Sequence, residues 1–530
     1  MSRSGGPDVG AGVLLRAYLR RDRWMLFWWT IGGAVLYWSQ AVSVEGLYTS
    51  QAEFDRAAAA MGSNPALVAM AGPARALNTV GGQVTWQATA FGAIVAGLMS
   101  MFLVGRHTRA EEESGRDELV RASAIGRRAP VTATVLEVVV ANVLLGALIA
   151  VSLIVVPLAV ADSVALGVGA ALCGVAFGGV ALVAAQLTST TRATYGITGA
   201  AMAAAYALRA VGDVGNEALS WLSPIGWYQR MYAFSGLRWW PALLLLALAV
   251  VMLVAAYAVL ERRDIGSGIF AARPGPATAA RRLGTPVGLA WRLQRGTVVG
   301  WALGLGFTGL AYGSIGDSAG DLIGDNEAAA EMMTAGGGDM VAGFQAVSMV
   351  MLALLTAGFA ISSALRPRTE EESGRVEPVL ATATSRTRWL LGNVVVTVAG
   401  SALVLGVAGL GMGLGYVLVT GKEEALWRMT WQTLTWLPAV LVLSGLTRLL
   451  HGVRPRLATF GWLGLGYAVV VLVLAEILQF PDWMRDLSPF EHLALVPAVD
   501  FDPTAFAAVL AVATLLGVGG WLAFLRRDVG

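Results

Sequence analysis

The residues whose types and spacing indicate chemistry most clearly are two copies of one charged sequence. Glu-Glu-Glu-Ser-Gly-Arg occurs at 111–116 and again at 370–375. Three adjacent carboxylates beside an arginine can form charge-assisted hydrogen bonds with the side chains of a partner protein. The charges could instead end a helix and solvate a loop, but a solvated loop has no need to keep the same six residues twice. We therefore interpret both copies as docking sites for another protein.

The elements that position these sequences must lie in a membrane, because the chain is too apolar for water. Of its 530 residues, 56% are hydrophobic and 14% are charged, whereas an ordinary soluble domain has roughly 25% charged residues. The net charge of +2 provides no basic field that would attract nucleic acid. Cys173 is the only cysteine, so disulfide frameworks and cysteine-based zinc sites are excluded. We expect an all-α integral membrane protein that contacts lipids and binds no nucleic acid.

Twelve apolar stretches are long enough to cross a bilayer as helices, which takes about 20 residues each. The predicted spans are 24–44, 76–105, 138–161, 163–191, 193–208, 239–260, 296–316, 340–365, 389–421, 429–447, 457–475 and 503–525. They form two sets of six. The span 193–208 is the shortest, and it is retained because its omission would leave the following loops on the wrong side of the membrane.

Basic residues orient these spans, because cytoplasmic loops carry an excess of arginine and lysine. With a cytoplasmic N-terminus, 29 of the 37 basic residues fall in cytoplasmic segments and 8 fall outside. Both acidic sequences then lie in the cytoplasm. We therefore predict a multi-pass protein of the plasma (inner) membrane, with both termini cytoplasmic and no cleaved signal peptide.

Other repeated sequences indicate that the whole chain is an internal duplication. Leu-Ser-Pro occurs at 222–224 and 487–489, and the last span of each set ends in Arg-Arg-Asp, at 262–264 and 526–528. Because both acidic sequences lie on the same side, the repeats are parallel. The predicted organisation is a first half, 1–265, a Gly- and Pro-rich cytoplasmic linker, 266–286, and a second half, 287–530. Each half begins with a basic interfacial helix, at 14–23 and 289–295.

Each acidic sequence should form a helix that leaves the second span of its half, breaks at Gly115 or Gly374, and continues as a second short helix. Ser114 and Ser373 suit the N-cap of that second helix. The predicted short-helix regions are about 111–127 and 370–386, with arginines at their ends. The docking role is assigned to Glu111, Glu112, Glu113, Arg116, Glu118, Glu370, Glu371, Glu372, Arg375 and Glu377.

This layout resembles the permeases of ABC-2 (type V exporter-like) ABC transporters. More narrowly, the paired acidic sequences and the Arg-Arg-Asp ends are similar to actinobacterial exporters of polyketide antibiotics, of the tetronasin-resistance type. The resemblance implies that the acidic sequences are coupling helices that dock on a separate ATPase, that the segments 213–238 and 481–502 are re-entrant, and that hydrophobic or amphiphilic compounds are exported by alternating access. Tryptophans that suit an interfacial position in or beside these segments are Trp221, Trp227, Trp239, Trp240 and Trp483.

The chain lacks a nucleotide site of its own. A phosphate-binding loop needs a lysine after glycine, and the only lysine, Lys422, is followed by glutamate in an outer loop. Gly304, Gly306 and Gly309 match a dinucleotide fingerprint but lie inside an apolar span. We therefore expect no catalytic or metal site in this chain, and two copies of a separate ATPase that binds ATP and Mg²⁺.

Several residues have weaker indications. By family analogy, the substrate pathway includes Trp86, Gln87, Phe91, Phe344 and Gln345. The histidines, His107, His451 and His492, have no spacing that indicates a shared metal. Glu137 and Glu476 lie near span ends, so we expect their carboxylates to reach water, although an ionisable residue in a span can be functional. The pairs Gly409/Gly413 and Gly411/Gly415 have the spacing of close helix packing.

Two other classes of function remain as alternatives. A proton-driven exporter would also have two six-helix halves, but it should carry charged residues deep within its spans. A membrane enzyme that acts on lipid-linked substrates should present clustered His, Asp or Glu at one membrane face. The outer loops contain scattered acids, including Asp482, Asp486 and Asp500, with no pattern of a site.

Overall fold

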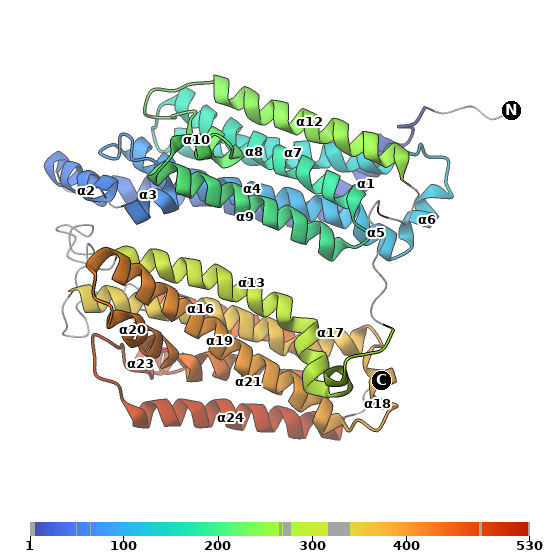
Figure 1. The fold of residues 1–530 in the computed structure, drawn as a ribbon, viewed down its shortest axis with the longest axis vertical. Coiled ribbons are helices and arrows are strands. Elements are labelled where there is room, and N and C mark those ends of the chain that lie inside the picture. The colour runs from blue at the N-terminus through green and yellow to red at the C-terminus, as the bar shows by residue number, and fades with distance from the viewer. Residues whose placement is uncertain are drawn as a thin grey trace. The chain divides into compact units, whose positions relative to one another are not determined.

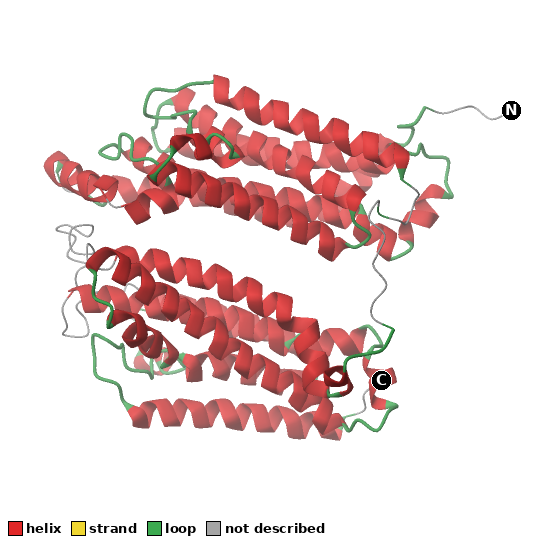
Figure 2. Cartoon of the chain, viewed as in Figure 1, coloured by secondary structure: helices red, strands yellow, loops and turns green. Residues whose placement is uncertain are grey.

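The computed structural model describes residues 6–48, 50–63, 65–263, 268, 277–315, 340–475 and 480–527. In these residues every regular element is a helix, and none is a strand (Figure 2). The chain divides into two compact units, Met1–Gly275 and Pro276–Gly530. The boundary falls inside the segment predicted as the linker. Each unit is described by itself.

The helices of the first unit are numbered along the chain in Figure 1. They are α1 (Ala11–Glu45), α2 (Gln51–Ser63), α3 (Pro65–Ala71), α4 (Val80–His107), α5 (Arg109–Glu113), α6 (Arg116–Arg121), α7 (Ala129–Val155), α8 (Val160–Leu187), α9 (Thr191–Val214), α10 (Glu217–Ser220), α11 (Pro224–Gln229) and α12 (Trp240–Arg262). The long helix α4 is central, and it contacts α1, α7, α8 and α9.

The second unit is also built from helices in its described residues. Its helices are η1 (Arg281–Gly284), α13 (Pro286–Ile315), α16 (Met340–Ala364), α17 (Arg366–Glu372), α18 (Val376–Leu380), α19 (Arg386–Thr420), α20 (Ala425–Leu434), α21 (Leu437–Val453), η3 (Pro455–Phe460), α22 (Gly461–Leu474), α23 (Asp482–Arg485) and α24 (Pro503–Arg526). The main packing is between α13 and α19 and between α21 and α24.

Ten helical stretches of the described residues are long and apolar enough to cross a membrane. Each coincides with one of the predicted spans, so the multi-pass membrane character is confirmed. The other two predicted spans, 24–44 and 193–208, lie in α1 and α9, which are long helices but too polar to be counted with the ten. Twelve spans therefore remain a prediction.

Glycines let the helices of the second unit approach closely. A Cβ on Gly409 or Gly413 would meet α20, whereas a Cβ on Gly411 or Gly415 would strike the backbone of α13. The predicted packing role of both pairs is confirmed, and the two pairs serve opposite faces of α19. In the sequence that matches a dinucleotide fingerprint, Gly306 and Gly309 likewise face α19.

The segment 213–238 contains only α10 and α11, each shorter than two turns. A buried ion pair holds it against the end of α9, where Arg230 lies 3.9 Å from Asp213. Within α9, Arg209 lies 3.5 Å from the same carboxylate. The Ser220 hydroxyl donates to Asp213 over 2.7 Å. From α11, the buried Tyr228 hydroxyl reaches the Tyr37 hydroxyl of α1, 2.9 Å away. The segment is therefore tied into the core of its unit.

Replacement of Gly313 by Ala tests the close packing of α13 on α19. The added methyl group would collide with the Met412 carbonyl oxygen, so we expect a loss of about 1–3 kcal/mol in the free energy of unfolding. The melting temperature of the purified chain in detergent measures it. Gly304→Ala, in the same helix with nothing within 4 Å of the new carbon, is the matched control; equal melting temperatures for the two variants would contradict the packing.

Candidate functional site

The predicted docking sequences each form two short helices separated by a glycine. We call α5 with α6, residues 109–121, the first elbow, and α17 with α18, residues 366–380, the second elbow. Gly115 has φ 72° and Gly374 has φ 66°, a left-handed conformation that favours glycine. The predicted break at both glycines is confirmed. Within the first unit the elbow lies at the same end as the start of α1 and the end of α12 (Figure 1).

The predicted caps and lengths of these helices are wrong. Ser114 follows the first helix and Ser373 follows its counterpart, and neither is an N-cap. Their hydroxyls donate over 3.1 Å to the carbonyl oxygens of Glu111 and Glu370, three residues earlier. The serines therefore close the first helix, because their hydroxyls find acceptors in the preceding turn. The second helices, α6 and α18, end at Arg121 and Leu380, so both are shorter than predicted.

The middle glutamate of each acidic sequence is engaged inside its own unit. Glu112 lies 2.5 Å from Arg263, at the end of α12, and 2.6 Å from Arg109. Glu371 lies 2.6 Å from Arg527, at the end of α24, and 3.1 Å from His451. The two carboxylate side chains are only 9% and 11% exposed. They are therefore structural ion pairs more than docking surface.

A second pair of contacts reinforces each of these ion pairs. Arg127 donates to the Arg263 carbonyl oxygen over 3.0 Å, and Arg386 donates to the Arg527 carbonyl oxygen over the same distance. In each unit one arginine at the end of the last helix is thus held by its side chain and by its carbonyl. We call these sets the locks; they consist of Glu112, Arg127 and Arg263 in the first unit, and of Glu371, Arg386 and Arg527 in the second.

Sequence analysis placed Arg127 and Arg386 at the ends of the short-helix regions and did not pair them with Arg263 and Arg527. Arg263 and Arg527 belong to the repeated Arg-Arg-Asp ends, and Arg127 and Arg386 follow the acidic sequences at equal spacing. Repetition of both partners in both halves was the signal that could have paired them.

The other acidic residues of the elbows differ in how much they are used internally. Glu111 lies 2.6 Å from Arg21 of α1, and Glu113 accepts hydrogen bonds from the Thr191 backbone and hydroxyl. In the second elbow, Glu370 and Glu372 pair with arginines four residues earlier, Arg366 and Arg368. The residues that remain exposed at the elbows include Arg116, Glu118, Leu119, Glu372, Arg375 and Glu377. Leu119 is 76% exposed.

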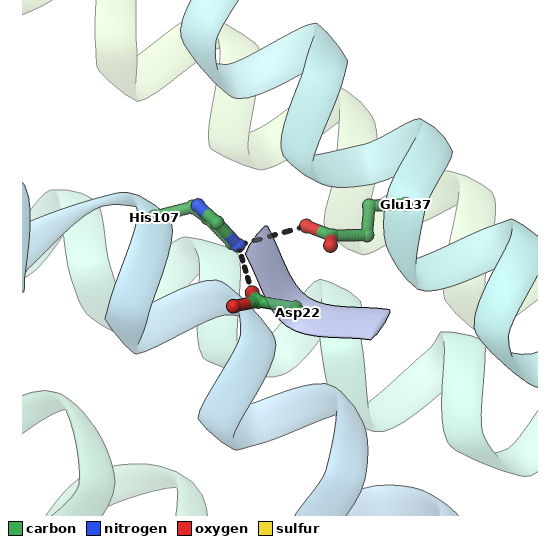
Figure 3. A group of neighbouring side chains, drawn as sticks. All are labelled: Asp22, His107 and Glu137. Carbon is green, nitrogen blue, oxygen red and sulfur yellow. Dashed lines mark hydrogen bonds and ion pairs between the residues drawn. The ribbon is translucent and has the colours of Figure 1, made fainter. Parts of the chain in front are cut away.

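A buried charged cluster includes His107, the last residue of α4, which lies two residues before the first elbow in the sequence (Figure 3). The His107 Nε2 atom lies 2.6 Å from Asp22 Oδ2 and 2.9 Å from Glu137 Oε2. All three side chains are fully buried. The expectation that the Glu137 carboxylate reaches water is therefore wrong, because this carboxylate points at the imidazole. The spacing of the histidines in the sequence indicates no shared site, but helix packing brings His107 to two carboxylates 85 and 30 residues away.

We call Asp22, His107 and Glu137 the buried triad. One imidazole nitrogen and two carboxylate oxygens within 4.8 Å of one another could hold a divalent cation. The nitrogen to oxygen distances are, however, those of hydrogen bonds, and Arg106 already occupies the other oxygen of Asp22 at 3.0 Å. Burial disfavours the charged form of Asp22 and so raises its pKa. The hydrogen bond to His107 and the nearby positive charges lower the pKa by more, so the pKa of Asp22 lies below its usual value. A proton-sharing histidine is the simpler chemistry.

The buried triad is connected to the first elbow through α1. Tyr18 stacks on the His107 ring with 3.9 Å between centroids, and Arg21 reaches both His107 Nδ1, at 3.4 Å, and Glu111, at 2.6 Å. A movement of the first elbow therefore acts on α1, α4 and α7 together.

The predicted pathway residues lie in different surroundings. Trp86 is 6% exposed and donates to the Gly72 carbonyl oxygen over 2.7 Å. It lines a cavity of about 30 Å³, which has room for one or two waters and not for a drug. Gln87 is half-buried, and Phe91 is 41% exposed. In the second unit Gln345 is buried and Phe344 half-buried. Glu476 lies outside the described residues.

The variants Glu112→Gln and Glu371→Gln test the locks. Each leaves an arginine at a helix end without its carboxylate, so we expect a loss of about 2 kcal/mol in the free energy of unfolding. The melting temperature of the full chain in detergent is the measurement. Glu118→Gln and Glu377→Gln, which change exposed elbow residues, should stay within about 0.5 kcal/mol of the wild type. Four equal melting temperatures would show that the locks carry no stability.

A double-mutant cycle tests the buried triad. His107→Leu leaves two buried carboxylates without their shared partner, so we expect a loss of about 3 kcal/mol. His107→Leu combined with Glu137→Leu should lose less than the sum of the single variants, because it also removes the stranded charge. Thermal unfolding measures all three, with His492→Leu at an exposed histidine as control. Strictly additive losses would argue against a coupled network.

Comparison with known proteins places this architecture in a transporter family. The chain is 39% identical over 529 residues to the multidrug efflux system permease protein Rv1217c of Mycobacterium tuberculosis (strain ATCC 25618 / H37Rv), a similarity that covers 99% of this chain and 96% of that protein. The family described as Multidrug efflux system permease Rv1217c, C-terminal domain, matches residues 283–525. With its multiple apolar helices and full-length similarity, the chain belongs to the Rv1217c-like family of multidrug efflux permeases.

Proposed function

We propose that this chain is the membrane subunit of an ATP-driven ABC exporter of the ABC-2 class. The observation that carries the proposal is the pair of elbows, each tied by an equivalent lock to the last helix of its unit. A separate ATPase, present in two copies with one under each elbow, binds ATP and Mg²⁺ and provides the energy for transport. Both elbows and both termini face the cytoplasm. The twelve-span, two-repeat arrangement is part of this proposal.

The cargo is a hydrophobic or amphiphilic compound. The relative from M. tuberculosis is named a permease of a multidrug efflux system, which supports drug-like molecules as substrates. The narrower resemblance to exporters of polyketide antibiotics belongs to the same proposal.

The locks and the buried triad explain how an elbow would transmit force. The lock joins the first elbow to α12, whereas Arg21 and the triad join it to α1 and α7. The second elbow is joined to α24 and, through His451, to α21. An ATPase that moves an elbow therefore moves a set of long helices as one body, and such rigid-body motion is enough for alternating access.

The docking surface is narrower than the sequence indicates. Because Glu112 and Glu371 are used in the locks, the contact with the ATPase falls to the exposed residues of α6 and α18 and their flanks. Glu118 and Glu377 occupy equivalent exposed positions, and Leu119 adds an apolar side chain beside the first of them. An exposed apolar residue with a rim of charges is typical of a protein interface.

A proton-driven exporter is the second candidate, and the buried triad is the observation that favours it. Ionisable residues at the ends of membrane spans, like those within them, can belong to a proton pathway. In the second unit the junction of α13, α16 and α19 contains neutral polar groups, since Ser363 donates to Gln294 over 2.6 Å and lies 2.8 Å from Thr397. A proton pathway would need a continuation beyond the triad, and the ATP-driven mechanism has support from both units.

Charge reversal at the exposed positions tests the docking role. In a strain that makes the chain with its ATPase, Glu118→Arg with Glu377→Arg should reduce copurification of the ATPase at least tenfold, because both contacts would become repulsive. The matched control is Glu423→Arg, at an exposed position in an outer loop. Quantitative mass spectrometry of the purified complex is the measurement, and size-exclusion chromatography reports folding. Undiminished copurification of the double variant would refute the docking role.

A further inference from the structure

The second unit contains an apolar groove whose one charged residue is an arginine. Three long helices form its walls, and the cavity volume is about 250 Å³. The groove is lined by Leu390, Leu391, Val394 and Val398 of α19, by Leu441, Ser444 and Arg448 of α21, and by Leu510, Ala513, Thr514, Gly517, Val518 and Trp521 of α24. The hydroxyls of Ser444 and Thr514 donate to carbonyl oxygens of their own helices. Arg448 is therefore the polar group of this groove that is left to bind a ligand.

The Arg448 guanidinium lacks a counterion within the described part of the chain. Its Nη2 atom is buried and has no hydrogen-bond partner there. At this end of the unit, Glu371 is already engaged by Arg527 and His451, and Glu370 and Glu372 are engaged by Arg366 and Arg368. A buried guanidinium nitrogen without an acceptor is costly, and an ionisable group within a span indicates a functional site with a partner to be named. An anion would satisfy both the positive charge and the free hydrogen-bond donor.

The groove has the length and the direction of one lipid leaflet. Arg448 and Trp521 each lie five residues before the ends of their helices, α21 and α24, on the side of the second elbow. From Trp521 to Leu510 the wall extends about 16 Å at 1.5 Å per residue, roughly half of the hydrocarbon thickness of a bilayer, about 30 Å. The groove thus runs from the elbow end of the unit to the middle of the predicted membrane.

The groove is also open to the side. Leu391 is 49% exposed, Val518 is 42% exposed and Leu510 is 38% exposed. In a membrane these surfaces contact acyl chains. A lipid of the leaflet on the elbow side could therefore enter laterally, with its acyl chain along α24 and its headgroup at Arg448.

We propose that this groove is a binding site for one acidic phospholipid of the cytoplasmic leaflet, whose phosphate pairs with Arg448. The site is separate from the elbows, and lipid binding there needs no ATPase. The bound lipid would fill the space between α19, α21 and α24 at the end of the unit that contains the second lock.

Photolabelling of the full chain in nanodiscs tests this site. The discs contain phosphatidylcholine with a small fraction of a diazirine-bearing phosphatidylglycerol, and the labelled peptides are identified by mass spectrometry. We expect labelling of the groove walls of α19 and α24, reduced at least fivefold in Arg448→Gln and retained in Arg448→Lys. Arg454→Gln, at an exposed arginine six residues further on, is the matched control and should label as the wild type does.

A second variant, a second photolabelled lipid and a competition experiment complete the test. Gly517→Leu adds a side chain where nothing lies within 4 Å, so it should fill the groove and abolish labelling with Arg448 intact. A diazirine-bearing phosphatidylcholine should label the groove at least fivefold less. Unlabelled phosphatidylglycerol should compete, and dodecanoate should not. Equal labelling by both lipids, labelling that survives both variants, or competition by dodecanoate alone would overturn the proposal.

Discussion

A carboxylate that is largely withdrawn from water must be paired, and this constraint organises the base of each unit. Glu112 and Glu371 meet it with Arg263 and Arg527, which end the last helices. Removal of one partner strands the other charge in a site of low polarity, and this cost makes such pairs persist through a conformational change. The carbonyl of the same arginine is also held, by Arg127 or Arg386. The elbow and the last helix can therefore move together more easily than apart.

Next to each elbow three long helices meet, and the buried polar side chains at this junction differ between the two units. In the first unit α1, α4 and α7 meet at the buried triad, where one imidazole serves two carboxylates. In the second unit the junction of α13, α16 and α19 holds Gln294, Ser363 and Thr397, which are neutral. A buried charged group that loses its partner costs more free energy than a buried neutral group does. Neutral hydrogen bonds can therefore change partners at a lower free-energy cost. The two units therefore differ at this junction, which is charged in the first unit and neutral in the second.

Much of the fold could be predicted from sequence because the determinants are local. Apolar length identifies the spans, and a Ser-Gly pair after three glutamates identifies the break at Gly115. The partners of charged residues could not be predicted in this way. Glu112 and Arg263 are 151 residues apart, and Asp22 and His107 are 85 apart. Their pairing depends on which helices become neighbours. Ser114 and Ser373 show the same limit at short range, since a serine between two helices can cap either one.

The central claim is that nucleotide in a partner ATPase moves the two elbows. Spin labels on Ala124→Cys and Ala383→Cys, at exposed positions beyond the two short helices of each elbow, in a chain whose only native cysteine, the buried Cys173, is replaced by alanine, report the distance between the elbows by double electron–electron resonance. In the reconstituted complex, a non-hydrolysable ATP analogue should shift the distance distribution to shorter values, and the permease without ATPase should show no shift. An unchanged distribution in the intact complex with bound nucleotide would contradict the account.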